Sequence, residues 1–242
     1  MDPKSAAVIY KVFYLVLNLV FTIYELIENF SVHLRNKLHE LRHEFLPVNK
    51  HRSFMKLDKI PTHLTVLLGC EEPSYQDLAN LILWCLAARI TFVSFYDYKG
   101  ALTKSEDKLR LVVEGKKNST DHVIWHDRVD SGYKNGYTGR KVHVKVLSRQ
   151  DGRGGFVKLT KELSGGADFT IDSFDQRLKK DFQFPDPDLG VCCGKTFSLF
   201  GYPPWQIRVT EFLTIRTHHN IKFNNFVELL SRYNKCEQRY GK

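Results

Sequence analysis

The sequence of 242 residues is poor in cysteine, and the few cysteines it has form no recognisable framework. There are five, an odd number, with no Cys-x-x-Cys spacing, and the histidines that could join them as ligands are scattered. This argues against a disulfide scaffold and a zinc site, and it favours a reducing compartment. With only 15 glycines and 8 prolines, the composition also excludes collagen-like and low-complexity proteins and is that of a folded chain.

Common catalytic and nucleotide-binding signatures are also missing. The sequence shows no Ser-His-Asp order, no His-Glu-x-x-His and no pair of carboxylates in a recognisable pattern. The Asp-Gly-Arg-Gly-Gly stretch at 151–155 has neither a Walker lysine nor the dinucleotide-binding spacing, so it predicts a tight turn that leads into a helix. The residues alone therefore offer no evident nucleophile and no acid–base pair.

A cysteine pair and two histidine sites remain as candidates for chemistry. Cys192 and Cys193 are adjacent with no histidine nearby, so we expect them to be buried as small apolar residues. His218 and His219 could bind a metal, but an adjacent pair is more typical of a polar loop or a helix end. His63 could act as a base, although its position just before an apolar run predicts a residue at the edge of a strand.

Acidic residues are outnumbered, with 36 lysines and arginines against 27 aspartates and glutamates and a formal charge of +9. Such a charge attracts the phosphates of nucleic acids, of lipid head groups or of a small diphosphate substrate, and its sign alone does not choose among them. Much of the excess lies between residues 97 and 161. We expect a solvated, loop-rich face there, with an anionic partner as the alternative.

The longest apolar run covers residues 6–24, and its only charge is Lys11. A bilayer core needs about 20 apolar residues in a helix, so this run is a marginal span, with an interfacial helix as the alternative. A secretory signal is disfavoured because no small-residue cleavage site follows. Residues 31–45 then place apolar side chains on one helical face, which predicts an amphipathic helix on a membrane surface or against its own domain.

In the rest of the chain, short apolar runs alternate with helical patterns. We expect strands at 64–68, 90–96, 123–125, 142–147 and 189–193, and helices from Ser74 and at 151–163, 171–180 and 225–236. Ser74 and Asp77 resemble a capping box, and Leu78, Ile82 and Leu86 form the buried stripe of the first helix. The alternation predicts an α/β fold with a mostly parallel central sheet flanked by helices, preceded by an N-terminal membrane-associated helix.

Three segments of this body carry a pattern that occurs together in one family. Residues 61–68 (PTHLTVLL) are similar to a first strand that leads into an Asp-Gly-Asn signature. Residues 187–206 are similar to a late segment, PDLxIRTSGExRLSNFxxWQ, with the same number of residues between PDL and WQ. The tail resembles a closing helix followed by Arg-x-Gly, here Arg239-Tyr240-Gly241. In these segments the chain resembles the cis-prenyltransferase family, the undecaprenyl and dehydrodolichyl diphosphate synthases, from residue 60 onward.

The departures from the family pattern concern its first strand. The family ends this strand with a catalytic aspartate that holds magnesium and the allylic diphosphate, whereas this chain has Gly69. Cys70 and Glu71 stand in place of the glycine and asparagine that follow. Magnesium requires oxygen ligands in octahedral geometry, and a glycine side chain supplies none. The resemblance therefore predicts a chain that has lost its own metal site.

The late segment also departs from the family pattern, because uncharged residues stand where the family has charged ones. A gapless alignment puts Cys192 and Ser198 where the family has two arginines that grip diphosphate, and Thr196 where it has a glutamate. Neither a thiol nor a hydroxyl replaces a charge-assisted bond to phosphate. Only Arg239 and Gly241 remain from the family's functional set, and the resemblance implies that this tail binds isopentenyl diphosphate in the active site of a partner.

A lost active site, a retained tail and an added membrane helix resemble the accessory subunits of the family's heteromeric enzymes. The resemblance implies a non-catalytic subunit that supports condensation of isopentenyl diphosphate with farnesyl diphosphate, yielding long-chain polyprenyl diphosphate for dolichol and protein glycosylation. It implies a catalytic cis-prenyltransferase partner in a heterodimer or higher heteromer, Mg²⁺ held mainly by that partner, and no nucleic acid. It also implies the endoplasmic reticulum membrane, with the globular domain on the cytosolic side.

The expected organisation is a membrane anchor helix at 1–30, an amphipathic helix and connector at 31–60, and a cis-prenyltransferase-like domain at 61–242. Two other functions remain open. A stand-alone homodimeric cis-prenyltransferase would need Glu71 or Glu72 to replace the missing aspartate. A membrane receptor or ligand-binding module would use the fold only as a scaffold.

Overall fold

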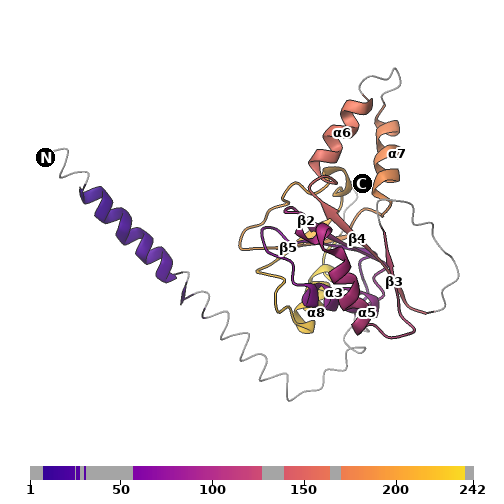
Figure 1. Ribbon diagram of the computed structural model, residues 1–242, viewed down its shortest axis with the longest axis horizontal. Coiled ribbons are helices and arrows are strands. Elements are labelled where there is room, and N and C mark those ends of the chain that lie inside the picture. Colours follow the sequence, from indigo (N-terminus) through magenta and orange to yellow (C-terminus); the bar gives the residue numbers. More distant parts are fainter. Residues whose placement is uncertain are drawn as a thin grey trace, which may run out of the picture. The chain divides into compact units, whose positions relative to one another are not determined.

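The computed structural model describes residues 8–24, 26, 27, 30, 57–126, 139–163 and 170–237. The chain divides into two units, Met1–Lys50 and His51–Lys242, and each is described by itself. In the first, residues 8–24 form a helix, indigo in Figure 1, whose large apolar side chains are exposed. Within the described part of the chain, no helix combines the length and the apolarity needed to span a membrane. The amphipathic helix predicted at 31–45 lies outside the described residues.

The second unit is built on a sheet of six parallel strands in the order β3-β4-β2-β1-β5-β6 (Figure 1). The strands are β1 (His63–Leu67), β2 (Phe92–Asp97), β3 (His122–Trp125), β4 (Lys141–Ser148), β5 (Leu189–Cys193) and β6 (Glu211–Ile215). The helices are α3 (Tyr75–Ala87), α4 (Ala101–Lys104), α5 (Glu106–Lys116), α6 (Arg153–Leu163), α7 (Ile171–Phe182) and α8 (Phe223–Asn234), with a 3-10 turn η1 (Pro204–Gln206). The predicted parallel α/β architecture is confirmed.

One face of the sheet is apolar and packs against α3, α5 and α8 (Figure 1). Strand side chains alternate between faces, so this face receives every second residue of β1, β2 and β4. The predicted stripe of α3 is confirmed, because Leu78, Ile82 and Leu86 are all buried in this core. The other contributors from the helices are Ala79, Leu81, Cys85, Leu102, Leu109, Val113, Phe226, Leu229, Leu230 and Tyr233.

The opposite face carries buried polar side chains, which is unusual for a parallel sheet covered on both sides. His63, Thr65 and Ser94 are fully buried and bonded to one another, with His63 Nε2 2.8 Å from Ser94 Oγ and Ser94 Oγ 2.9 Å from Thr65 Oγ1. His63 Nδ1 lies 2.6 Å from the carbonyl oxygen of Pro185. The prediction that His63 lies at the edge of a strand is right in that it is the first residue of β1, but its side chain is fully buried in the core.

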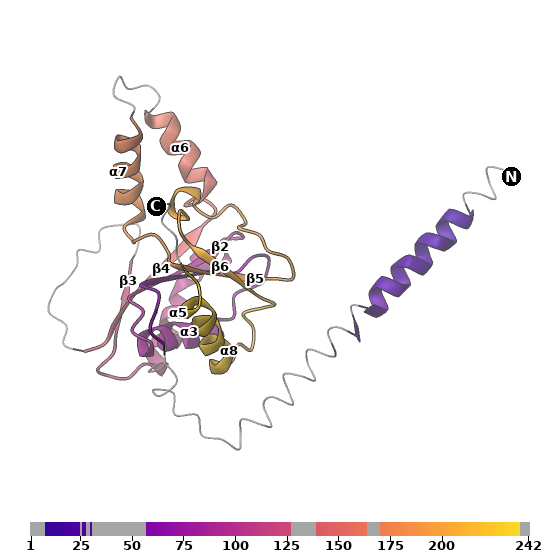
Figure 2. The same cartoon turned by 180° about the vertical axis from the view of Figure 1, so that it is seen from behind.

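Helices α6 and α7 lie side by side and project from the carboxyl end of β4 (Figures 1 and 2). The rings of Phe156 and Phe174 hold them together, with centroids 5.0 Å apart. The Lys145 ammonium, from β4, donates to the carbonyl oxygen of Phe182 at 2.5 Å, so it caps the end of α7. The turn predicted at 151–155 is confirmed, since Gly152 approaches Gly201 so closely that a Cβ would lie 2.0 Å from its carbonyl oxygen.

Some expectations for the local structure are wrong. The stretch 97–161 is not mainly loop, because its described residues include α4, α5, β3, β4 and most of α6. Strand β6 was not predicted. Ser74 is the N-cap of α3, but its hydroxyl donates to the Asp77 carboxylate at 2.5 Å and accepts no backbone bond, so the capping box does not form. Cys192 and Cys193 are buried as predicted, and all five cysteines are free.

Candidate functional site

The order of the strands locates one crevice in this fold. The chain moves from β1 to β2 on one side and from β5 to β6 on the other, so the direction of winding reverses between β1 and β5. In parallel α/β sheets, ligands bind at such a point, just outside the carboxyl ends of the strands. The residues that follow β1 and end β5 are therefore the first place to look for a site.

Gly69 lies at this point and leaves no room for a side chain. Its φ is +64°, a conformation that residues other than glycine rarely adopt, and a Cβ would lie 2.8 Å from the carbonyl oxygen of Cys193 and 3.0 Å from the Phe200 ring. The aspartate that the family pattern has here would meet both groups. The neighbouring atoms therefore leave no space for the side chain of that aspartate.

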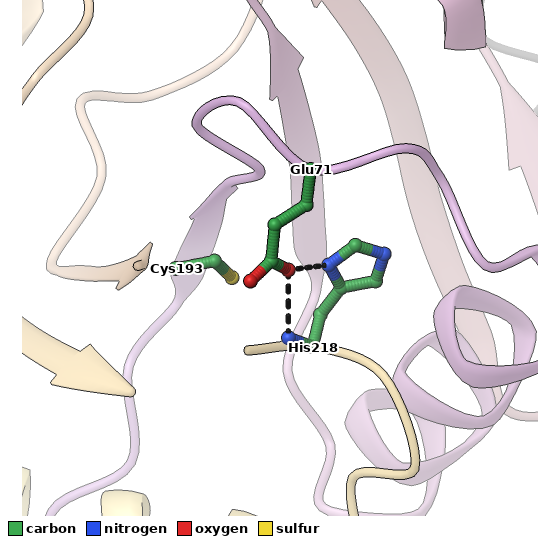
Figure 3. Close-up of side chains that lie close together, drawn as sticks. All are labelled: Glu71, Cys193 and His218. Carbon is green, nitrogen blue, oxygen red and sulfur yellow. Dashed lines mark hydrogen bonds and ion pairs between the residues drawn. The ribbon is translucent and has the colours of Figure 1, made fainter. Parts of the chain in front are cut away.

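Glu71 and His218 form a hydrogen-bonded pair at this edge of the sheet. Glu71 Oε2 lies 2.6 Å from His218 Nδ1, and it also accepts from the His218 backbone N–H at 3.2 Å and from the Thr217 hydroxyl at 3.0 Å. Figure 3 shows the Glu71 carboxylate between this ring and the thiol of Cys193. Burial acts to raise the pKa of Glu71, but these bonds outweigh it and lower the pKa below its usual value.

The tautomer of His218 follows from its second nitrogen. The Ser74 backbone N–H donates to His218 Nε2 at 3.0 Å, so this nitrogen presents a lone pair and the ring proton resides on Nδ1, facing Glu71. The ring is fully buried with both nitrogens engaged. The prediction that the histidine pair lies in a loop is right, but His218 is part of the core and only His219 is exposed.

Two further bonds tie the same loops together. The Asn220 backbone N–H donates to Asp77 Oδ2 at 3.1 Å, and His219 Nε2 donates to the carbonyl oxygen of Glu72 at 2.9 Å. With the Glu71 and Ser74 bonds, they join the segment after β1 to the segment after β6. We call this set of bonds between residues 71–77 and 217–220 the loop clasp.

Glu71, Cys193 and His218 have the donor atoms of a metal site, all within 4.8 Å of one another. Sequence spacing argued against such a cluster, because its members lie far apart along the chain. The hydrogen bonds argue against it in a second way. A metal on Nδ1 would normally leave a proton on Nε2, which would then face the Ser74 N–H, donor against donor. A thiol and an imidazole are also poor ligands for magnesium, so these residues do not fit that ion.

The alternative carboxylates are also engaged. Glu71 belongs to the loop clasp, and Glu72 points outward, with 71% of its side chain exposed and the Lys99 ammonium 2.8 Å away. Neither takes the place of the missing aspartate. The stand-alone enzyme therefore lacks the carboxylate that it would require.

The late segment also lacks the charged side chains of the family pattern. Cys192 is buried in β5, where burial raises its pKa to about 11, and Ser198 accepts the Phe200 backbone N–H at 3.3 Å. Thr196 is exposed. None of the three positions supplies a cation. Arg239 and Gly241, the predicted site residues in the tail, lie outside the described residues, which reach 237.

The fold is that of a cis-prenyltransferase-like domain, with Gly69 where the family pattern has an aspartate. Among solved structures, lavandulyl diphosphate synthase from Lavandula x intermedia matches with a TM-score of 0.52 at 14% identity, covering 75% of this chain and 98% of that one, which concerns the fold alone. No protein-family model matches the chain.

The similarity in sequence is more specific than the similarity in fold. The chain is 32% identical to "Dehydrodolichyl diphosphate synthase complex subunit Nus1" of Mus musculus over 206 residues, which are 77% of this chain and 67% of that protein. It is 30% identical to the Homo sapiens subunit of the same name, over 77% of this chain and 68% of that protein. The chain belongs to the family of Nus1 subunits of the dehydrodolichyl diphosphate synthase complex.

Proposed function

We propose that this chain is the non-catalytic subunit of a heteromeric dehydrodolichyl diphosphate synthase. The observation that carries the proposal is the packing after β1. Gly69 stands where the family pattern has an aspartate, and the Cys193 carbonyl oxygen and the Phe200 ring leave no room for a side chain there. Glu71, the next carboxylate along the chain, is engaged by His218 and Thr217. This chain belongs to a family of complex subunits and has no carboxylate at position 69. It therefore contributes to the chemistry of a partner. The partner condenses isopentenyl diphosphate with farnesyl diphosphate to make long-chain polyprenyl diphosphate for dolichol and glycosylation, and it holds the magnesium ion.

The contribution of this chain is its C-terminal tail. Arg239 offers a planar guanidinium that forms paired hydrogen bonds with a diphosphate. Gly241 lets the backbone approach the phosphate without a clashing side chain, and its N–H donates there. Together they bind isopentenyl diphosphate in the partner's active site. The folded body of this chain then serves to place the tail.

The surface that meets the partner includes residues 197–206 and those that follow. Two large apolar side chains are exposed in this region, Phe197 at 52% and Val209 at 38%. Trp205 between them is fixed by its Nε1–H, which donates to Asp175 Oδ1 at 2.7 Å. Exposed apolar side chains next to ordered polar groups are typical of protein interfaces.

The first unit attaches the complex to the endoplasmic reticulum membrane, with the body on the cytosolic side. Residues 8–24 support this role, because their apolar side chains are exposed around the whole helix, as expected for contact with lipid. Lys11 is the one charge within these residues, near the end that faces the N-terminus. It reaches the head groups from there.

The test is the activity of the full-length chain co-purified with its catalytic partner from membranes. In Arg239→Ala we expect an intact complex whose turnover at low isopentenyl diphosphate falls about ten- to a hundredfold, because a charge-assisted hydrogen bond is lost. Lys242→Ala, in the same tail, is the control and should keep wild-type kinetics. Unchanged kinetics in Arg239→Ala, or prenyl transfer by the isolated chain, would overturn the proposal.

A further inference from the structure

The segment that enters the body lies against the segment that leaves it. The Lys59 backbone N–H donates to Asn234 Oδ1 at 2.7 Å, at the last residue of α8. The Lys59 ammonium donates to the carbonyl oxygen of Cys236 at 2.9 Å and lies 4.5 Å from the centroid of the Tyr233 ring. One lysine therefore makes three contacts with the final turn of α8 and the residues after it.

The contacts of Lys59 are polar or charged, whereas its neighbours in the sequence make apolar contacts. Leu57 and Ile60 flank Lys59 and lie against the apolar core, so they hold the entering segment to the body without Lys59. The ammonium acts on a carbonyl at the carboxyl end of a helix, where the helix dipole is negative and a cation is favoured. Its bond fixes Cys236, which lies beyond the last helical residue. Lys59 therefore holds the Cys236 carbonyl from the other end of the body, while the Cys236 backbone N–H and thiol donate to carbonyls of the last turn of α8.

The fixed point lies close to the tail in sequence. Cys236 is three residues before Arg239. Three residues span at most about 10 Å, so the place where Cys236 is held limits the volume in which the Arg239 guanidinium can be found. Restricting that volume reduces the entropy lost when the tail binds a ligand.

We propose that Lys59 is a positioning residue for the C-terminal tail, holding its point of departure from the body so that Arg239 reaches isopentenyl diphosphate in the partner's active site. This inference rests on the proposed function. Lys59 does not touch the substrate in this account and acts through Cys236.

The first measurement is hydrogen exchange of the full-length chain in its complex, comparing wild type with Lys59→Met. The amides of Lys235 and Cys236 donate to Arg232 and Tyr233 carbonyls at 3.1 and 3.0 Å. In Lys59→Met we expect these amides to exchange about three- to tenfold faster, because the last turn loses a charged hydrogen bond. Lys59→Arg keeps a donor and should restore slow exchange.

The second measurement is the kinetics of the same complexes. We expect KM for isopentenyl diphosphate to rise about three- to tenfold in Lys59→Met, with kcat changed less, since the tail is displaced and not removed. Asn234→Ala, which removes the other bond, should shift KM in the same direction. Lys116→Met is the matched control: its ammonium donates to Asn80 Oδ1 at 2.9 Å and joins α5 to α3, so its loss should leave KM unchanged.

The outcomes separate this inference from the proposed function. Normal exchange and normal KM in both Lys59→Met and Asn234→Ala, with Arg239→Ala impaired, would overturn the role of Lys59 and leave the proposed function standing. Wild-type kinetics in Arg239→Ala would overturn both. A raised KM in Lys59→Met that Lys59→Arg restores, together with faster exchange confined to the end of α8, supports the positioning role.

Discussion

His218 Nδ1 lies 2.6 Å from Glu71 Oε2, although 147 positions separate the two residues in the sequence. The bond joins the loop after the central strand β1 to the loop after the edge strand β6, on either side of the end of β5. In an α/β protein that binds phosphate at this edge, these loops would surround the ligand. Here they bind each other.

Replacing Glu71 tests the loop clasp. Glu71→Gln should lower the free energy of unfolding by about 1–2 kcal/mol at pH 7, because three donors lose a charged acceptor. The folded pKa of Glu71 is below its usual 4.5, so its contribution is present above pH 4.5 and is lost as pH falls through the folded value. The difference between the two proteins in urea unfolding should therefore shrink in acid. Glu72→Gln, on the exposed neighbour, should have little effect; equal effects of both variants would contradict the clasp.

His63 should make the free energy of unfolding depend on pH in a higher pH range than Glu71 does. Burial lowers its pKa from 6.5 to about 4, assisted by the nearby Lys145 charge and opposed by the Pro185 carbonyl. The unfolded chain therefore binds the proton first, and stability is lost as pH falls from 6.5 to about 4. The loss is about 3 kcal/mol by linkage.

Urea unfolding at several pH values measures this loss. In His63→Gln, the dependence of unfolding free energy on pH between 4 and 6.5 should become shallower. His219→Gln, with an exposed side chain, serves as control. An unchanged slope in His63→Gln would show that the imidazole does not titrate as its surroundings require.

Gly69 and Gly100 provide a matched pair for the crevice. Both have a left-handed backbone, with φ of +64° and +73°, but only Gly69 has neighbours within reach of a Cβ. Each alanine variant incurs about 1 kcal/mol of backbone strain, and Gly69→Ala should cost about 1–3 kcal/mol more because of overpacking. Thermal or urea unfolding measures the difference. Similar losses would mean that the space at Gly69 opens readily, and Gly69→Asp would then deserve an assay for magnesium-dependent prenyl transfer.

Four of the five thiols should react in a definite order. Cys70 is exposed, whereas Cys85, Cys192 and Cys193 are buried, and burial raises the pKa of each of these three. Since the thiolate is the reactive form, alkylation followed by mass spectrometry should label Cys70 first and the buried three only on unfolding. Cys70→Ser should remove the fast phase. Rapid labelling of Cys193 in the native state would contradict the packing at the end of β5.

The sequence predicted the elements that owe their structure to continuous apolar runs. Strand β5 has the predicted bounds, because all five residues from Leu189 to Cys193 are buried and none needs a polar surface. Helix α5 was missed because only Leu109 and Val113 are buried among mostly charged neighbours. Strand β6 lies at an edge and mixes Glu211 and Thr214 with apolar residues, so its pattern resembles a loop.

The site was only partly predictable. The missing aspartate at Gly69 was visible from the family resemblance, and this is what indicated a non-catalytic chain. The loop clasp was not visible, because residues 71–77 and 217–220 follow β1 and β6, which the order of the sheet brings to the same edge. The same order brings Cys193, at the end of β5, close to Glu71 and His218. The useful signal was present: a glutamate directly after the first strand and a cysteine at the end of another, which a parallel sheet with the winding reversed between them brings to one edge.

The packing around Gly69 makes a carboxylate difficult to restore at this position during evolution. A single codon change that restores the aspartate at Gly69 would have to overcome a left-handed backbone, a carbonyl oxygen and an aromatic ring, while the two loops remain locked to each other. A lineage that has reached this arrangement is therefore committed to its partner.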